Sequence, residues 1–183
     1  KSTMPDDLKN RCHQCRKPSP ENDKEQIERL REWVVKGKAW AQGMMGQWYC
    51  EGKHGIKQSY VMARMLFEKA VAQGDPNAMY NLACMYRDGE GVAQSFKKTV
   101  ELYAMAAEQG YAKAMYNLAL LYADGRGVAQ SFKKAAELYT MAAEKEYPKA
   151  MLNLGVLYFQ GQGVAQSNEL AREWLTKAAN EGE

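Results

Sequence analysis

The sequence has no long apolar run. Its longest apolar stretch, Leu118 to Ala123, is far too short to cross a bilayer. It also has little net charge, because 25 Lys and Arg residues against 22 Asp and Glu residues leave only +3. Proteins that bind nucleic acid usually carry a concentrated basic face, so this small net charge gives no reason to expect a nucleic-acid partner. No secretory signal peptide is apparent, although the sequence starts at Lys1, which leaves a targeting segment upstream open. We therefore expect neither membrane insertion nor a nucleic-acid partner.

Cysteine and histidine are scarce, with four and two residues respectively. Cys50 and Cys84 stand alone in different segments and do not recur as disulfide-forming pairs would. This usage favours a reducing, intracellular setting, most simply the cytoplasm. No nucleophile elbow, zinc-protease helix or pair of catalytic carboxylates is found. We therefore expect a protein that is not an enzyme, with no catalytic residue and no cofactor in this chain.

One short segment does contain residues that could bind a metal ion. Cys12 and Cys15 are separated by two residues, and two thiolates at this spacing form half of a zinc site. A structural site needs four ligands, and His13, between the two cysteines, is poorly placed as a third. The alternatives are an unligated pair in an irregular arm, residues 1–22, or a redox pair without the expected thioredoxin-like setting.

Internal repetition is what the sequence has in abundance. Residues 78–113 and 114–149 align without gaps and are identical at 26 of 36 positions. The pattern begins again in residues 150–183, and a fainter copy occupies residues 41–77. A fixed period of this length is typical of stacked helical repeats. We therefore predict an all-α solenoid in which each repeat contacts only its neighbours.

Each repeat divides into two predicted helices, A and B, and the second repeat shows this most clearly. Asp75 is a good N-cap for helix A, predicted over residues 77–88. Ser95 is suited to cap helix B, which is predicted to run to about Gln109. Gly110 can then end helix B in a left-handed conformation, and two further glycines allow the tight turn between the helices.

Two kinds of position should control the packing of the repeats. Small residues recur at fixed positions and should let the helices approach closely. These are Ala83, Ala119 and Gly155 on the A helices and Ala106, Ala142 and Ala178 on the B helices. In contrast, Glu146 stands where the preceding repeat has Gly110. Because a side chain disfavours the left-handed conformation, we expect that corner to be reshaped.

Residues 23–40 are predicted to contain a helix that caps the array at its N-terminal end. Four apolar residues fall on one face of this helix, at the spacing of an amphipathic helix. They are Ile27, Leu30, Trp33 and Val34. Gly37 aligns with the glycines that end later helices and should close this one.

The repeated motif resembles a known family. The pattern Ala-x-Tyr-Asn-Leu-Ala/Gly-x-x-Tyr-x-x-Gly-x-Gly-Val, followed by Glu-Leu-Tyr-x-x-Ala-Ala, resembles the Sel-one-like repeat, a relative of the tetratricopeptide repeat. The resemblance covers about residues 23–183. It implies a right-handed α-solenoid of about four repeats with the A helices lining a concave groove. Similar proteins act as scaffolds or adaptors, so the resemblance implies a protein or peptide partner.

The resemblance also implies which A-helix residues face the groove, namely those beside the buried Leu-Ala pair. Successive repeats contribute Tyr80, Asn81, Cys84 and Arg87, then Tyr116, Asn117, Leu120 and Asp124, then Leu152, Asn153, Val156 and Phe159. The three asparagines form a ladder whose amides can both donate to and accept from a peptide backbone. The alternative is that they bond to neighbouring helices and hold the stack. Tyr80 and Tyr116 are interpreted as surface anchors, and Tyr86, Tyr122 and Tyr158 as core.

The N-terminal cysteine pair has a resemblance of its own. Cys12-x-x-Cys15-Arg-x-Pro resembles the last ligand pair of a RING-type zinc domain, a module that recruits ubiquitin-conjugating enzymes. The other zinc ligands would then lie upstream of Lys1. This resemblance implies an alternative function, the substrate-recognition part of a ubiquitin ligase, with zinc bound only in a longer protein.

Overall fold

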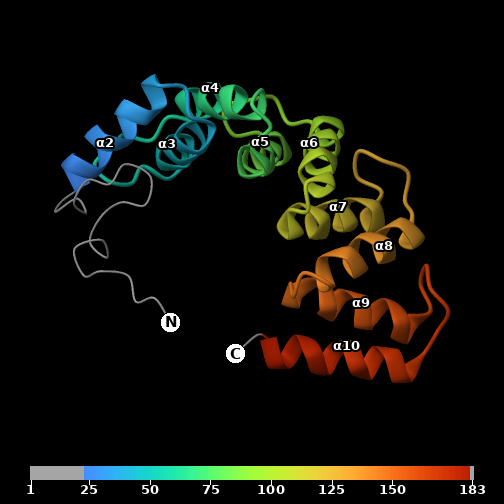
Figure 1. The fold of residues 1–183 in the computed structure, drawn as a ribbon. Coiled ribbons are helices and arrows are strands. Elements are labelled where there is room, and N and C mark those ends of the chain that lie inside the picture. The colour runs from blue at the N-terminus through green and yellow to red at the C-terminus, as the bar shows by residue number, and fades with distance from the viewer. Residues whose placement is uncertain (1–22, 182–183) are drawn as a thin grey trace, which may run out of the picture.

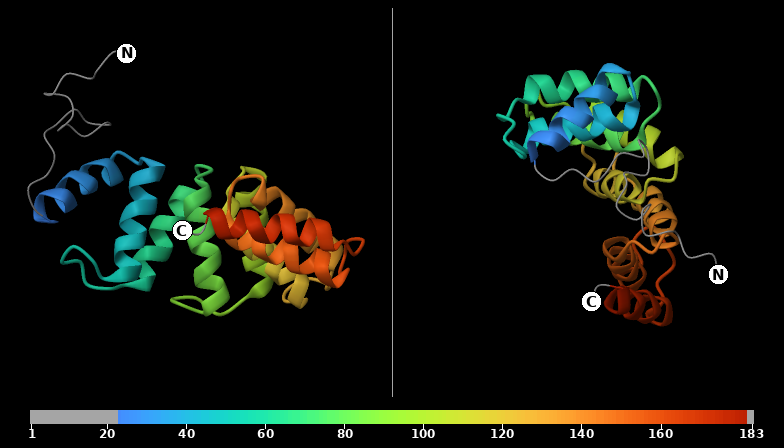
Figure 2. Two further views of the ribbon diagram at one scale, coloured as in Figure 1. Left: turned by 90° about the horizontal axis from the view of Figure 1, so that it is seen from below. Right: turned by 60° about the vertical axis from the view of Figure 1, so that its left-hand side comes forward.

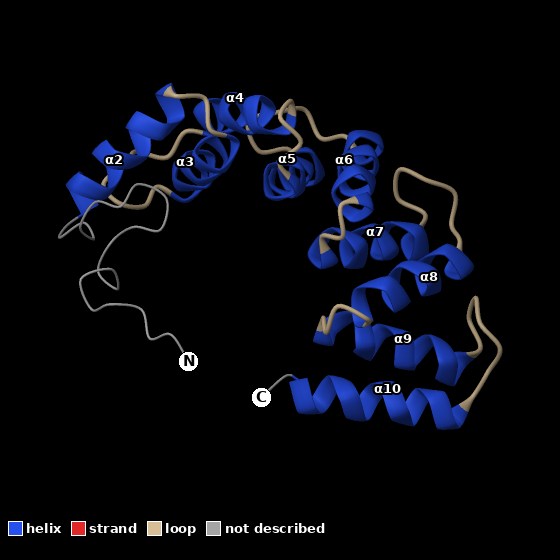
Figure 3. Ribbon diagram, viewed as in Figure 1, coloured by secondary structure: helices blue, strands red, loops and turns tan. Residues whose placement is uncertain are grey.

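The computed structural model describes residues 23–181, and within this range the chain forms helices and no strand (Figure 3). Helix α2 (Asp23–Val35) stands first, and four pairs of an A helix and a B helix follow. The pairs are α3 (Ala39–Glu51) with α4 (Tyr60–Val71), α5 (Pro76–Asp88) with α6 (Phe96–Glu108), α7 (Ala112–Asp124) with α8 (Phe132–Ala143), and α9 (Pro148–Gln160) with α10 (Asn168–Glu181). The predicted all-α solenoid of helix-turn-helix repeats is confirmed.

The helices are stacked along an arc. Each packs mainly against the helix before it and the helix after it, as expected for a solenoid. Figure 1 shows α3, α5 and α7 on the inner side of this arc and α4, α6 and α8 on its outer side. Figure 2 shows the same array from two further directions, with α2 near one end and α10 at the other. The A helices therefore supply the inner face of the arc.

The starts of the helices follow the predicted capping residues. The Asp75 carboxylate accepts a hydrogen bond from the Ala78 N–H at 2.7 Å, and Pro76 occupies the first turn of α5. The Ser95 hydroxyl accepts from the Lys98 N–H at the start of α6, and serines cap α4 and α8 in the same way. These side chains satisfy amide groups that have no partner within the helix.

The turns between helices A and B lie against the preceding repeat. Gly127 has a φ of +76°, and a Cβ atom added there would lie 2.6 Å from the carbonyl carbon of Phe96. Gly163 meets Phe132 in the same way, one repeat later. Glycine at these positions therefore provides both a left-handed backbone and the room for one repeat to rest on the next.

The corner between α8 and α9 is not reshaped, so that expectation is wrong. Glu146 adopts a left-handed φ of 57°, as Gly110 does with a φ of 81°. The Glu146 N–H donates to the Ala143 carbonyl at 2.9 Å, and the Tyr147 N–H donates to the Ala142 carbonyl at 3.2 Å. The same two bonds close α6, so helix-closing hydrogen bonds hold the backbone in place despite the side chain.

The buried residues of the described helices form clusters along the stack, in which small and large side chains alternate. The small residues predicted to allow close approach are all buried: Ala83, Ala106, Ala119, Ala142, Gly155 and Ala178. Tyr103, Phe67 and Met115 fill the spaces between them. At the N-terminal end, Leu30 is buried, and its three predicted partners on α2 pack against the first repeat. The predicted apolar face of α2 is confirmed.

Candidate partner-binding surface

Two groups of three tyrosines lie along the array at successive repeats. The Tyr80 ring lies 5.6 Å from the Tyr103 ring and 5.4 Å from the Tyr111 ring, measured between centroids. One repeat later the pattern recurs, because Tyr116 lies 5.8 Å from Tyr139 and 5.3 Å from Tyr147. We call these groups the tyrosine triads. Such tilted ring pairs at this separation are favourable and hold each other's orientation.

Each triad combines residues from three different elements. Tyr80 comes from α5 and Tyr103 from α6, whereas Tyr111 precedes α7 in an extended conformation without a side-chain cap. Tyr103 is fully buried and forms the base of its triad, while Tyr80 and Tyr111 are half-buried. Burial raises the pKa of Tyr80 to about 12. A phenol is protonated at neutral pH even without this shift, so the Tyr80 hydroxyl can donate a hydrogen bond.

Polar groups converge on the hydroxyl of Tyr103. Arg87 Nη1 donates to this oxygen at 3.3 Å, and Cys84 Sγ lies 3.3 Å from it. The same arginine donates to both carboxylate oxygens of Asp88, at 2.7 and 2.8 Å. Burial is the main cause that raises the pKa of Tyr103. Two of the predicted groove residues, Cys84 and Arg87, are thus brought together around a tyrosine from the B helix.

The second triad has a different polar partner. Leu120 and Ala123 replace the cysteine and arginine, and the Tyr139 hydroxyl instead accepts a hydrogen bond from Asn153 Nδ2 of α9 at 3.1 Å. Burial raises the pKa of Tyr139 to about 12, and the bond from Asn153 acts in the opposite direction. This tyrosine therefore connects α8 to the next repeat through a hydrogen bond.

Beyond the triads, the fourth repeat presents an apolar surface. Leu152 and Phe159 are 50% and 60% exposed, and Val156 lies between them at helical spacing on α9. Leu175 of α10 packs beside them against Gly155, where an added Cβ would lie 2.9 Å from its Cγ. We call these four residues the apolar stripe. By the repeat period, Leu152 and Leu175 occupy the positions of Tyr116 and Tyr139, so the stripe continues the line of the triads without their hydroxyls.

The predicted asparagine ladder does not behave as one unit. Asn153 bonds to a neighbouring helix, whereas Asn117 Nδ2 donates to the Lys113 carbonyl of its own helix at 2.8 Å. Asn81 is half-buried. Asp124 is exposed and pairs with Arg126 at 3.4 Å. Asn117, Asn153 and Asp124 thus have partners within the chain, and they do not form a continuous row of unpaired groups.

Sequence reasoning did not single out the half-buried Tyr111 and Tyr147, and it did not place the buried Tyr103 and Tyr139 against Tyr80 and Tyr116. A signal was available, because a tyrosine before each of the last two A helices recurs with the 36-residue period. The rings of Tyr86 and Tyr122 pack against the core as interpreted. Each also carries a lysine ammonium over its face, at 4.7 Å for Lys98 and 5.1 Å for Lys134.

Metal and membrane sites were sought in the same part of the chain. Among residues 23–181, no group of three or more His, Cys, Asp or Glu side chains is placed to hold a metal ion. Cys12 and Cys15 lie outside these described residues. No helix of the described chain is both long and apolar enough to span a membrane.

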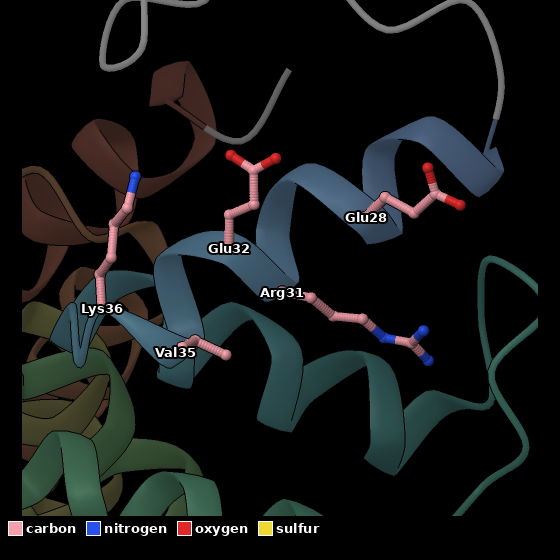
Figure 4. A pocket seen from close by; sticks show the side chains of 5 residues that line it. All are labelled: Glu28, Arg31, Glu32, Val35 and Lys36. Carbon is pink, nitrogen blue, oxygen red and sulfur yellow. The ribbon is translucent and has the colours of Figure 1, made fainter.

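A hollow of about 530 Å³ lies on α2, on the face that does not pack against the first repeat (Figure 4). Its described lining comes from one face of this single helix: Glu28, Arg31, Glu32, Val35 and Lys36. One helix face cannot surround a ligand, whereas ligand sites are concave and use groups that converge from several directions. We therefore regard the triads and the apolar stripe as the better candidate surface.

The helix pairs, their buried small residues and their glycine turns together define an α-solenoid repeat protein. The Sel1 repeat family model matches residues 41–75, 76–111, 112–147 and 148–183, so this chain belongs to the Sel1 repeat family. Members of this family are generally non-enzymatic scaffolds for protein–protein interaction. No curated protein sequence matches the chain.

Solved structures show the same fold. A protective antigen of uropathogenic Escherichia coli, c5321, is 28% identical with a TM-score of 0.85, and the alignment covers 91% of this chain and 36% of that protein. A Sel1 repeat protein from Oxalobacter formigenes is also 28% identical, with a TM-score of 0.80 and a coverage of 88% and 65% respectively. The chain therefore spans less than two thirds of either protein. The cysteine-rich protein B of Helicobacter pylori, at 20% identity and a TM-score of 0.53, shares the fold.

Proposed function

We propose that the inner face of the arc binds a protein or peptide segment, which makes this chain a non-enzymatic scaffold. The apolar stripe is the observation that carries the proposal. Its large apolar side chains stay exposed side by side on α9 and α10, at the end of the line of triads. Contiguous exposed apolar side chains on a folded protein commonly mark an interaction site.

The two halves of this surface suit different parts of a partner. The triads offer aromatic rings with hydroxyl groups, and such amphipathic side chains can contact apolar atoms while they bond to a peptide backbone. The apolar stripe offers no hydroxyl and suits an aliphatic or aromatic side chain. A bound segment would thus place polar backbone groups on Tyr80 and Tyr116 and insert one apolar anchor beside Phe159. Anchors of this kind commonly supply most of the binding energy.

Peptides selected from a random display library against the whole chain test this proposal. Leu152→Asp/Phe159→Asp should weaken the selected peptides by about tenfold or more, a loss of about 1.4 kcal/mol, because it places charge where the anchor packs. Fluorescence anisotropy would measure the affinities. Since both side chains are exposed, helicity should stay unchanged in circular dichroism.

Val35→Asp is the matched control, because it makes the same kind of change at an exposed site on α2, near the opposite end of the array from α10 (Figure 2). It should leave the affinity unchanged. Equal binding by the double variant and this control would overturn the proposal. Asn117→Ala/Tyr116→Ala should also weaken binding, and unfolding of that variant would mean that these two residues are structural.

A second candidate function rests on the Cys12–Cys15 pattern alone. If the whole protein is a ubiquitin ligase, the repeats would select its substrate and the missing zinc ligands would lie upstream of Lys1. We expect this chain to bind no stoichiometric zinc in elemental analysis. Tight binding of one zinc ion by the monomer would contradict the view that the site is incomplete.

A further inference from the structure

A second concave feature lies between α6 and α8. Figure 1 shows these two helices on the outer side of the arc. The feature is a hollow of about 290 Å³, with a floor from α7 and walls from the two B helices. Its lining comprises Ala104, Ala107, Glu108, Leu118, Tyr122, Lys134, Glu137, Leu138 and Met141. We call it the outer hollow. Leu118 is two residues from Tyr116, about 200° around α7, so the outer hollow opens away from the triads.

The small side chain of Ala104 leaves room in the wall of the outer hollow. By the repeat period, the residue equivalent to Ala104 is Glu68 in the preceding repeat and Thr140 in the following one. Both are larger, and the Thr140 hydroxyl is fixed on its own helix by a hydrogen bond to the Ala136 carbonyl at 2.9 Å. The wall of the outer hollow therefore has a smaller side chain at this position than the equivalent positions of the two neighbouring repeats.

The floor and the rim of the outer hollow have different chemistry. The interior is apolar, because Leu118 lies on the floor and Leu138 and the partly exposed Met141 lie on the α8 wall. Methionine is flexible and adapts to varied apolar shapes. Glu108 and Glu137 stand exposed at the rim, and neither carboxylate makes a hydrogen bond or ion pair with a described residue. The one lining cation, Lys134, lies over the Tyr122 ring. The rim therefore offers two carboxylates to a positively charged partner.

We propose that the outer hollow binds a partner peptide through one aliphatic or aromatic side chain that is flanked by lysine or arginine. The apolar side chain enters between α6 and α8, and the flanking cations pair with Glu108 and Glu137. The volume lies near the lower end of the range for small-molecule sites, about 300 Å³, which suits a single large side chain. Charge complementarity sets the choice of flanking residues, because acidic neighbours would meet two unpaired carboxylates.

This site is separate from the proposed function of the inner face. Because the triads and the outer hollow use opposite sides of the same helices, the chain can hold one segment on each side at once. Failure of one site would leave the other unaffected, so the two proposals are distinguished by where bound peptides perturb the protein.

The test uses capped tripeptides and ¹⁵N-labelled whole chain in nuclear magnetic resonance titrations. Lys-Phe-Lys should shift amide signals of α6, α7 and α8 around the outer hollow, and Lys-Ala-Lys and Glu-Phe-Glu should shift them several-fold less at equal concentration. Glu108→Gln/Glu137→Gln should weaken Lys-Phe-Lys by about fivefold at low salt, and added salt should reduce that difference. Ala104→Glu, the residue of the preceding repeat, should abolish the shifts.

Several results would overturn the proposal. Equal shifts from Lys-Phe-Lys and Glu-Phe-Glu would exclude the role of the carboxylates, and shifts confined to the triads or the apolar stripe would place the peptide elsewhere. An absence of shifts at millimolar peptide would exclude the site. Ala104→Thr, the residue of the following repeat, is a second and milder filling variant in case the glutamate disturbs folding. Unaltered binding by a folded Ala104→Thr protein would also count against the proposal.

Discussion

The second and third repeats differ at ten of 36 aligned positions, yet their helices, serine caps and glycine turns coincide. The hydrogen bonds of their buried tyrosines differ. Around Tyr103 the hydrogen-bond partners come from its own repeat, Cys84 and Arg87, whereas Tyr139 is bonded by Asn153 of the following repeat. The small residues, caps and glycines that the repeats share therefore determine the fold of each repeat. The few positions where they differ decide which surfaces are polar and which are hollow.

The largest effect is expected where a glycine turn rests on the neighbouring repeat. Gly127→Ala should lower the free energy of unfolding by about 3 kcal/mol, because it combines a left-handed backbone with a Cβ 2.6 Å from the Phe96 carbonyl carbon. The contacted Phe96 atoms are backbone and cannot rotate away as a flexible side chain could. Urea denaturation followed by circular dichroism would measure the change.

Gly74→Ala is the control for that variant. Gly74 also has a positive φ of 81°, but an added Cβ would have no atom within 4 Å. The cost should be only about 1 kcal/mol, that of the left-handed conformation. If both variants lost the same stability, close approach between repeats would not be what requires glycine at position 127.

Much of this fold could be predicted from the sequence, because its signals are local and are repeated. Asp75 and Ser95 precede their helices, and glycines mark the turns, so helix boundaries follow from a single repeat. The 36-residue period then stacks the repeats. The conformation of Glu146 was predicted wrongly, because the hydrogen bonds that close α8 outweigh the preference of one residue.

The candidate surface was harder to predict. The sequence places Tyr80 and Tyr116 on the groove face, but it cannot show that rings from a B helix and from the residue before the next A helix pack against them. Those contacts depend on the rotation between repeats, which no local pattern encodes. The outer hollow likewise depends on the three-dimensional spacing of α6 and α8, since Ala104 by itself is an ordinary helical alanine.

The difference between the two tyrosine environments predicts a smaller effect. Tyr103→Phe should lower the free energy of unfolding by about 1–2 kcal/mol, because it removes the shared partner of Arg87 and Cys84 from a fully buried site. Tyr139→Phe should cost only about 0.5–1 kcal/mol, because it removes one bond from the half-buried Asn153. Equal losses in urea denaturation would contradict the distinction between the two interiors.

The smallest effect is expected at the corner where the repeats exchange glycine for glutamate. Glu146→Gly should raise the free energy of unfolding by about 0.5 kcal/mol. It removes the strain of a non-glycine residue in a left-handed conformation, and the greater freedom of glycine in the unfolded chain offsets part of that gain.

Gly110→Glu is the reciprocal change and should lower the free energy of unfolding by a similar amount. An added Cβ at position 110 meets only the flexible end of Lys145, at 3.2 Å, so sterics should add little. Denaturation of both variants would compare the two corners directly. Opposite shifts of similar size would show that backbone strain distinguishes them, whereas a loss of stability in both would mean that each corner has come to depend on its own residue.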